Sequence, residues 1–275
     1  MYLSTHTIHQ LKRIQELLDQ LHPKADPLAL SVPGLPEPRD SVIVFTGSFN
    51  PPTRAHLALL KQAQYYARQH EPMHVYAAFS KLTVDKEKVE RPLLLDRIML
   101  LKRILRRRLP HAGILLFNRG LYVEQAEALR RSFPKVKRIL FLMGFDKIVQ
   151  IFDQHYYEDR DAALSKLFSM AELLVAPRGN GGEHEIEALI HQPQNERFAR
   201  YVHTIPFNPA YRDVSSTHVR QGGSAYAHDV PREVREFMRD TRAYAPPLRK
   251  PDRSQVDYYQ ERIRCLSKQL AMSLS

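Results

Sequence analysis

Residues 42–56 read VIVFTGSFNPPTRAH, and this stretch is the strongest indication of the fold. Its apolar start, residues 42–45, is short, β-branched and unalternating, which is typical of a strand buried on both faces of a parallel sheet. Apolar residues at helical spacing come next, at Leu57, Leu60, Ala63 and Ala67. The turn-forming segment between them therefore lies where a central strand ends and a helix begins. Open α/β sheets bind nucleotides at such junctions.

The chemistry of this junction favours a phosphate group. Gly47 allows a sharp turn and close backbone approach to a ligand. A helix entered near Thr53 offers unpaired N–H groups and the positive end of its dipole. His56, one turn inside, can donate a hydrogen bond to a phosphate oxygen. Taken alone, the segment is also compatible with an ordinary strand-to-helix loop that contains a hydrogen-bonded histidine.

A second segment, residues 213–220, reads DVSSTHVR. Ser-Ser-Thr is a cluster of helix N-cap residues. Arg220 follows about one turn later, so it could point back at a ligand bound at the helix N-terminus. The alternative for an arginine beside capping hydroxyls is a solvated surface side chain.

Apolar strand-like runs and helical patterns alternate along most of the chain. Such alternation indicates a parallel sheet with right-handed crossovers, so we predict an α/β fold with a Rossmann-like open parallel sheet and helices on both faces. The predicted strands are 42–46, 74–79, 114–117, 138–143, 172–176 and 201–205, and the main predicted helices are 54–69, 93–108 and 122–132.

The ends of the chain differ in character from its centre. Residues 7–21 form an amphipathic pattern that must cover an apolar surface, for which we expect the flank of the main domain. Residues 22–38 contain five prolines and are predicted to be a linker without regular structure. We therefore divide the chain into an N-terminal helix and Pro-rich linker (1–40), a main domain (41–245) and a peripheral C-terminal helical appendage (246–275).

Composition narrows the class of protein. The chain has 275 residues, 43% of them hydrophobic, and its single cysteine excludes an intrachain disulfide. No apolar run is long enough to span a membrane and no secretory signal is present, so we expect the cytoplasm, the nucleus or both, and no membrane partner. The net charge of +11 raises the alternative of a nucleic-acid-binding module. No RNA-binding or helix-turn-helix pattern accompanies the basic clusters, so we expect no nucleic-acid partner and assign the charge to steering of anionic substrates.

Together the two segments resemble motifs of the nicotinamide mononucleotide adenylyltransferases, members of the nucleotidylyltransferase superfamily. Residues 47–56 match G-x-F-x-P followed by T-x-x-H, with threonine in its first position as in eukaryotic-type members. Residues 213–220 match the family's I-S-S-T-x-[I/V]-R element. Gly144-Phe145-Asp146 resembles its G-x-D, and residues 173–179 resemble the strand that ends in R-x-G. The pattern is similar to a divergent, fungal-like branch.

The resemblance implies an open Rossmann-like fold and a set of site residues. It implies His56 and Arg220 as catalytic residues. One of the lysines of 81–88 would meet the mononucleotide phosphate. The implied ATP and nucleotide contacts are Gly47, Ser48, Phe49, Thr53, Gly144, Asp146, Arg178, Ser216, Thr217 and Val219.

The chain departs from the family where the pyridine ring would stack. The family commonly uses tryptophan there, and this sequence has none. Tyr157 and Tyr122 stand at the corresponding positions, and tyrosine can stack with a smaller face. Arg212 occupies the usual place of an asparagine before the second motif.

The function implied is transfer of AMP from ATP to nicotinamide or nicotinate mononucleotide, with Mg²⁺ accompanying ATP and no protein metal cluster. Three alternatives remain: a cytidylyl- or adenylyltransferase for another phosphate acceptor, a nucleotide-binding regulator or weak ATPase, and a basic nucleic-acid-binding module. The sequence leaves open the choice of amide or acid mononucleotide and whether the chain forms a homo-oligomer.

Overall fold

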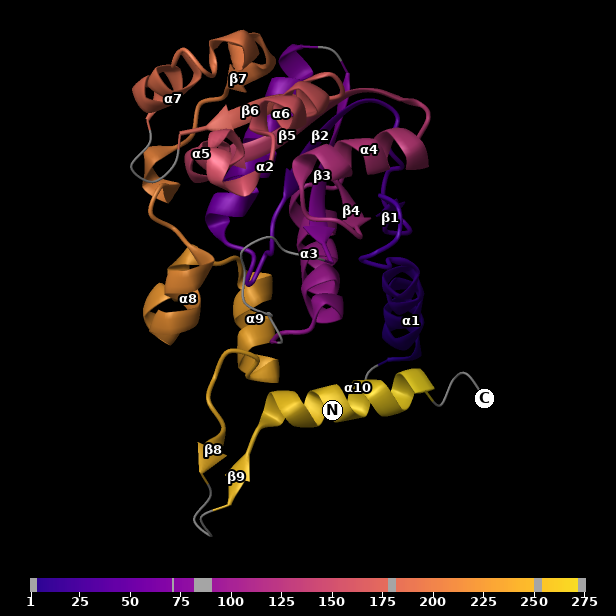
Figure 1. Ribbon diagram of the computed structural model, residues 1–275. Coiled ribbons are helices and arrows are strands. Elements are labelled where there is room, and N and C mark those ends of the chain that lie inside the picture. Colours follow the sequence, from indigo (N-terminus) through magenta and orange to yellow (C-terminus); the bar gives the residue numbers. More distant parts are fainter. Residues whose placement is uncertain (1–3, 71, 82–90, 178–181, 250–253, 272–275) are drawn as a thin grey trace.

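The computed structural model describes residues 4–70, 72–81, 91–177, 182–249 and 254–271. Within these ranges a seven-stranded sheet forms the centre of the molecule (Figure 1). Its strand order is β1-β4-β3-β2-β5-β6-β7, and all pairs are parallel except β1 with β4. The strands are β1 (Ala29–Ser31), β2 (Asp40–Thr46), β3 (Met73–Ser80), β4 (Gly113–Phe117), β5 (Val136–Gly144), β6 (Glu172–Ala176) and β7 (Val202–Thr204).

The strand order reverses between β2 and β5. From β2 the chain builds outward through β3 and β4, and then returns to place β5 on the other side of β2. This is the switch point at which open α/β sheets leave a crevice beyond the carboxyl ends of their strands. The segment that follows β2 and the segment that follows β5 therefore meet at one edge of the sheet.

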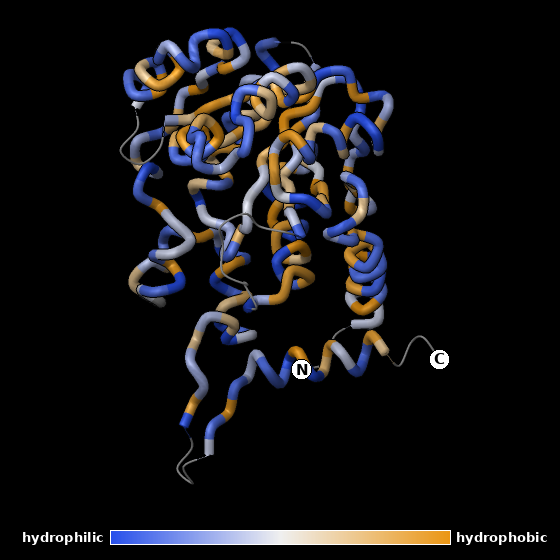
Figure 2. Tube along the Cα trace, in the orientation of Figure 1, coloured by the Kyte–Doolittle hydropathy of each residue, from blue (hydrophilic) through white to orange (hydrophobic). Residues whose placement is uncertain are grey.

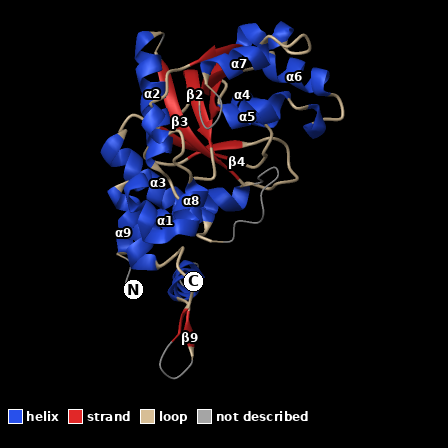
Figure 3. Ribbon diagram, turned by 90° about the vertical axis from the view of Figure 1, so that its left-hand side faces the viewer, coloured by secondary structure: helices blue, strands red, loops and turns tan. Residues whose placement is uncertain are grey.

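Helices cover both faces of the sheet (Figures 1 and 3), as the alternating pattern predicted. They are α1 (Thr5–Gln20), α2 (Arg54–Gln69), α3 (Leu94–Arg108), α4 (Tyr122–Ser132), α5 (Phe145–Phe152), α6 (Arg160–Phe168), α7 (Glu183–Ile190), α8 (Ser216–Gly222), α9 (Arg232–Thr241) and α10 (Tyr258–Ala271). Strands β8 (Leu248–Arg249) and β9 (Gln255–Val256) form a small hairpin that projects away from the body. No helix among the described residues is long and apolar enough to cross a membrane.

The core has two layers, one on each face of the sheet. Figure 2 shows the hydropathy along the trace, with hydrophobic residues frequent in the strands of the sheet. Val42 and Val44 point into the layer under α4–α7, whereas Ile43 points into the layer under α1–α3 and α8–α10. All three are fully buried, which confirms that β2 is covered on both faces. Leu11 and Ile14 of α1 belong to the same layer as Ile43, so the N-terminal helix does cover the flank of the main domain.

The linker prediction was wrong in part. Residues 29–31 form β1, an edge strand that pairs antiparallel with β4. The physical reason is that Pro27 and Pro33 flank this tripeptide without interrupting it, so its backbone keeps the N–H groups that a ladder needs. The C-terminal segment, expected to be peripheral, also enters the core: in α10, Tyr259 is 0% and Leu266 2% exposed.

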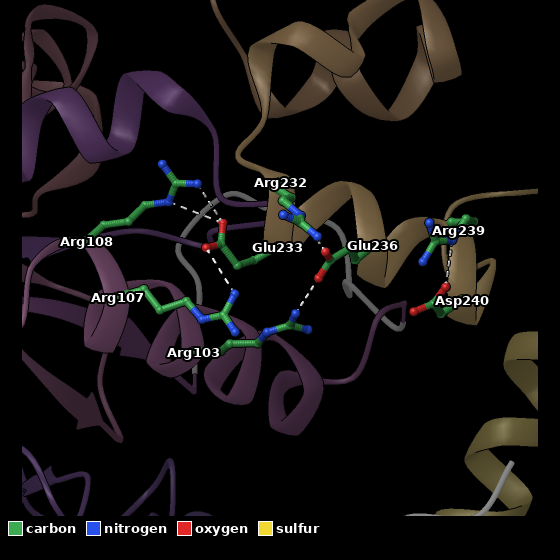
Figure 4. Close-up of polar contacts among 8 residues, drawn as sticks. All are labelled: Arg103, Arg107, Arg108, Arg232, Glu233, Glu236, Arg239 and Asp240. Atoms are coloured by element: carbon green, nitrogen blue, oxygen red, sulfur yellow. Dashed lines mark hydrogen bonds and ion pairs between the residues drawn. The ribbon is translucent and has the colours of Figure 1, made fainter.

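Arginines of α3 and glutamates of α9 join these two helices (Figure 4). Glu233 is almost fully buried and accepts hydrogen bonds from Arg108 at 3.0 and 3.2 Å. It also forms an ion pair with Arg107 at 3.9 Å. Glu236 pairs with Arg103 across the same interface. Burial raises the pKa of Glu233, but its backbone hydrogen bond and the two arginines outweigh burial and hold it below its ordinary value. Much of the basic cluster of α3 is thus structural.

Candidate active site

Hydrogen bonds of backbone groups fix both ends of the loop between β2 and α2. Gly47 donates its N–H to the carbonyl oxygen of Ala78 at 2.9 Å, and a Cβ there would meet the Phe49 ring at 3.3 Å. Thr53 is the N-cap of α2, which begins at Arg54 as predicted, and the Thr53 hydroxyl accepts the N–H of His56 at 3.4 Å. The backbone therefore enters α2 with its first N–H groups turned toward the loop.

His56 completes a capping box. Its Nδ1 accepts the N–H of Thr53 at 2.9 Å and lies 2.8 Å from the threonine hydroxyl. Because Nδ1 is the acceptor, a neutral ring carries its proton on Nε2. The ring is 8% exposed and packs 5.1 Å from Phe49. The site thus holds the imidazole in a single orientation as a hydrogen-bond donor.

Phe49 has a strained backbone. Its φ is +42°, in the left-handed region that non-glycine residues rarely occupy. The side chain is 0% exposed and its ring contacts Phe45, Phe79 and His56. This packing holds the residue in the strained conformation, a situation that is found most often at ligand-binding sites.

The second predicted motif docks on the first. Ser216 donates its hydroxyl to the carbonyl oxygen of Pro51 at 2.8 Å. Arg220 donates from Nη1 to the carbonyl oxygen of Asn50 at 2.5 Å and from Nη2 to the Thr217 hydroxyl at 3.1 Å. The structure therefore brings together both predicted catalytic residues and most of the predicted nucleotide contacts.

The remaining nucleotide candidates occupy different environments. Gly144 is the last residue of β5 and the N-cap of α5. Asp146 lies in the first turn of the same helix with its carboxylate exposed. Val219 is 1% exposed and belongs to the core, so its side chain serves packing. Arg178 lies outside the described residues.

The two predicted stacking residues, Tyr122 and Tyr157, line one hollow that is open to solvent. Lys147 of α5 contributes a cation to the same lining. Burial raises the pKa of both tyrosine hydroxyls, so both remain neutral donors. The hollow is tied to the end of β2 through Gln125, whose side chain accepts from Thr46 at 2.7 Å and donates to Gly120 at 3.0 Å.

Among the lysine candidates only Lys81 is described. Its ammonium donates to the carbonyl oxygen of Leu18 at 2.7 Å, which binds it to the end of α1. Lys86 and Lys88 lie outside the described residues.

Sequence reasoning missed Arg97, an almost fully buried arginine that donates to the carbonyl oxygen of Ser48 at 2.8 Å. The charged pair Asp96-Arg97 inside an otherwise apolar helical stretch was the available signal.

Comparison with known proteins agrees with this geometry. Residues 44–222 match a family model described as cytidylyltransferase-like. The chain belongs to this family. It is thereby a member of the nucleotidyltransferase superfamily, and the match spans both motifs of the site.

Two further comparisons accompany the family match of this nucleotidyltransferase. A search of curated protein sequences finds no significant match. Among solved structures, a Vibrio parahaemolyticus protein provisionally described as a nicotinate-nucleotide adenylyltransferase is similar at 13% identity and a TM-score of 0.42. The alignment covers 75% of this chain and 96% of that one.

Proposed function

We propose that this nucleotidyltransferase transfers AMP from ATP to nicotinamide or nicotinate mononucleotide, forming a dinucleotide and pyrophosphate. The observation that carries the choice of acceptor is the hollow that Tyr122 and Tyr157 share, with Lys147 on its lining. Two aromatic faces suit a planar pyridine ring, and a lysine suits the mononucleotide phosphate. The hollow reaches the switch-point loop through Gln125.

The reaction needs no nucleophile from the protein. An oxygen of the mononucleotide phosphate attacks the α-phosphorus of ATP, a new P–O bond forms, and the bond to the β-phosphate oxygen breaks to release pyrophosphate. Catalysis therefore consists of holding the two substrates in line and stabilising charge on the phosphoryl oxygens. His56 and Arg220 supply a fixed N–H donor and a guanidinium for that purpose.

The other residues hold the nucleotides in place. Thr217 accepts a hydrogen bond from Arg220, and Ser216 attaches the helix that carries Arg220 to the loop at Pro51. Gly144 permits close approach of a ribose. The exposed carboxylate of Asp146 can accept hydrogen bonds from the ribose hydroxyls. Arg178 remains a proposed phosphate ligand from the resemblance alone.

Mg²⁺ would accompany ATP as part of the substrate. Among the residues that the structure describes, no group of three His, Cys, Asp or Glu side chains is placed to hold a metal ion. Mg²⁺ commonly keeps several waters and binds through substrate phosphates, a mode that needs few protein ligands. Its chemistry here would be to neutralise charge on the phosphate oxygens.

The test is dinucleotide formation from ATP, Mg²⁺ and nicotinamide mononucleotide, with pyrophosphate followed in parallel and CTP as a competing donor. We expect equal amounts of both products, a preference for ATP, and a loss of rate on the order of 10²–10³ in His56→Ala. Phosphate release without dinucleotide would contradict the proposal and indicate a weak ATPase. Turnover with CTP alone would indicate a cytidylyltransferase.

A further inference from the structure

A buried cation lies beneath the switch-point loop. Arg97 is 8% exposed, and its Nη1 donates to the carbonyl oxygen of Ser48 at 2.8 Å. Its Nε is buried and has no hydrogen-bond partner among the residues that the structure describes. Within the described part of the chain no carboxylate pairs with Arg97. The neighbouring carboxylate, Asp96, pairs with Arg262.

Such an arrangement is costly unless something compensates it. Removing a guanidinium from water without a counter-ion carries a large desolvation penalty. Burial lowers the pKa of the Arg97 guanidinium, and its electrostatic partners are the hydroxyls of Tyr244 and Tyr259, which burial keeps neutral. An anion bound at the loop would supply the missing negative charge.

Arg97 also orients the peptide between Ser48 and Phe49. In a planar trans peptide the C=O and the N–H point in opposite directions. Fixing the Ser48 carbonyl toward Arg97 therefore turns the N–H of Phe49 away from the helix. Phe49 is the strained residue of the loop, at φ +42°. Buried packing of its ring and the hydrogen bond from Arg97 together hold this peptide in one orientation.

The C-terminal segment contacts the turn of α3 that carries Arg97, through the neighbouring residues Asp96 and Leu93. The hydroxyl of Tyr259 donates to Asp96 at 2.7 Å and accepts the N–H of Leu93 at 2.7 Å. Arg262 adds two hydrogen bonds to Asp96 at 2.6 and 3.1 Å. Both residues belong to α10, which lies across the lower end of the molecule (Figure 1) and outside the region that the family model matches. The first turn of α3 is thus held between α10 and the loop.

A second connection joins the same segment to the loop. Tyr244 donates to the Asn50 side-chain oxygen at 2.8 Å. Arg91 donates to the carbonyl oxygen of Ala243 at 2.8 Å and forms two hydrogen bonds with Asp257, at 2.5 and 2.8 Å. The residues that follow α9 therefore contact the loop directly and also through α3.

We propose that Arg97 is a positioning residue for the nucleotide phosphates, which orients the N–H of Phe49 toward them and supplies buried positive charge. We propose further that Tyr244, Tyr259 and Arg262 of the C-terminal segment hold it there. This inference rests on the proposed function only for its claim that the loop binds phosphate. It assigns a role in that site to a part of the chain outside the family match.

The experiment compares ATP with adenosine. Calorimetric titrations with each ligand are made on the wild-type chain, Arg97→Met, Arg97→Lys and the matched control Arg103→Met, after thermal melts show that each is folded. Arg103 lies on the same helix, and its half-exposed side chain pairs with Glu236. We expect Arg97→Met to weaken ATP binding by on the order of tenfold to a hundredfold while adenosine binding stays unchanged. Arg97→Lys should recover part of the loss, and Arg103→Met should behave as wild type.

The outcomes separate this inference from the proposed function. Equal loss of ATP and adenosine binding in Arg97→Met, or no loss, would overturn the role of Arg97 even where wild-type dinucleotide synthesis is observed. Should Arg97→Met not fold, Arg97→Lys carries the same comparison. Wild-type protein that binds ATP without forming dinucleotide would contradict only the proposed function, and wild-type protein that binds no ATP would overturn both.

Tyr259→Phe tests the role of the C-terminal segment. We expect a loss of ATP affinity smaller than that of Arg97→Met, with adenosine affinity unchanged. A lower melting temperature with unchanged ATP affinity would overturn the role of this segment.

Discussion

The guanidinium of Arg220 donates a hydrogen bond to the carbonyl oxygen of Asn50 at 2.5 Å, although the two residues are 170 positions apart. This contact joins the second motif to the switch-point loop that begins after β2. Arg220 itself stays exposed, so it can serve both the loop and a ligand. The site is therefore formed from the two ends of the family-matched region.

From this position we predict that Arg220→Ala lowers turnover far more than it lowers stability. Loss of one donor to the transition state costs about 3–4 kcal/mol, or 10²–10³ in rate. An exposed side chain contributes little to the free energy of unfolding. Steady-state kinetics and thermal melts measure the two effects, with Arg239→Ala as control because that exposed arginine pairs with Asp240 on the surface of α9. A variant with normal turnover would remove Arg220 from the catalytic set.

The shared hollow gives a prediction for the second substrate. Tyr157→Ala should raise the KM for the mononucleotide and leave the KM for ATP unchanged, because a stacked aromatic pair is worth about 0.5–1.5 kcal/mol beyond its buried area. Tyr157→Phe should retain most of the affinity, since it keeps the ring. Substrate titrations of Tyr157→Ala, Tyr157→Phe and Tyr122→Ala make the comparison. An unchanged mononucleotide KM in both alanine variants would exclude stacking in this hollow.

Much of the site followed from local patterns in the sequence. The predicted helix 54–69 is α2 and the predicted helix 122–132 is α4, because apolar periodicity and Thr53 at the N-cap are local signals. The Asp96–Tyr259 contact could not be predicted in this way. Its partners are 163 positions apart, and one buried hydrogen bond leaves no periodic trace in either helix. Sequence alone also missed β1, where local proline content concealed a pairing with β4.

The buried pair of Asp96 and Arg262 gives a stability prediction. Asp96 is 2% exposed, so Arg262→Met leaves a buried carboxylate without its cation and should cost about 3–5 kcal/mol of unfolding free energy. Adding Asp96→Asn to that variant removes the charge and should recover part of the loss. Urea unfolding of both single variants and the double variant measures the coupling. Additive effects, with no recovery in the double variant, would show that the pair does not act as a unit.

Acid should destabilise the protein through Glu172, at the first position of β6. Arg138 forms two hydrogen bonds with this carboxylate, at 2.8 and 2.7 Å, and together with His203 at 2.5 Å it holds the pKa of Glu172 below 4.5 despite burial.

Because the pKa is lower in the folded state, the contribution of Glu172 is fully present above about pH 4.5 and is lost as the pH falls through the folded value. Glu172→Gln should therefore cost about 1–3 kcal/mol at neutral pH and much less in acid, where the wild-type carboxyl is also protonated. Urea unfolding at neutral pH and at steps below pH 4.5 measures this, with the exposed Glu158→Gln as control. A difference in unfolding free energy between wild type and Glu172→Gln that stays constant across that range would contradict the prediction. It would show that the ionised carboxylate does not stabilise the contact between β5, β6 and β7.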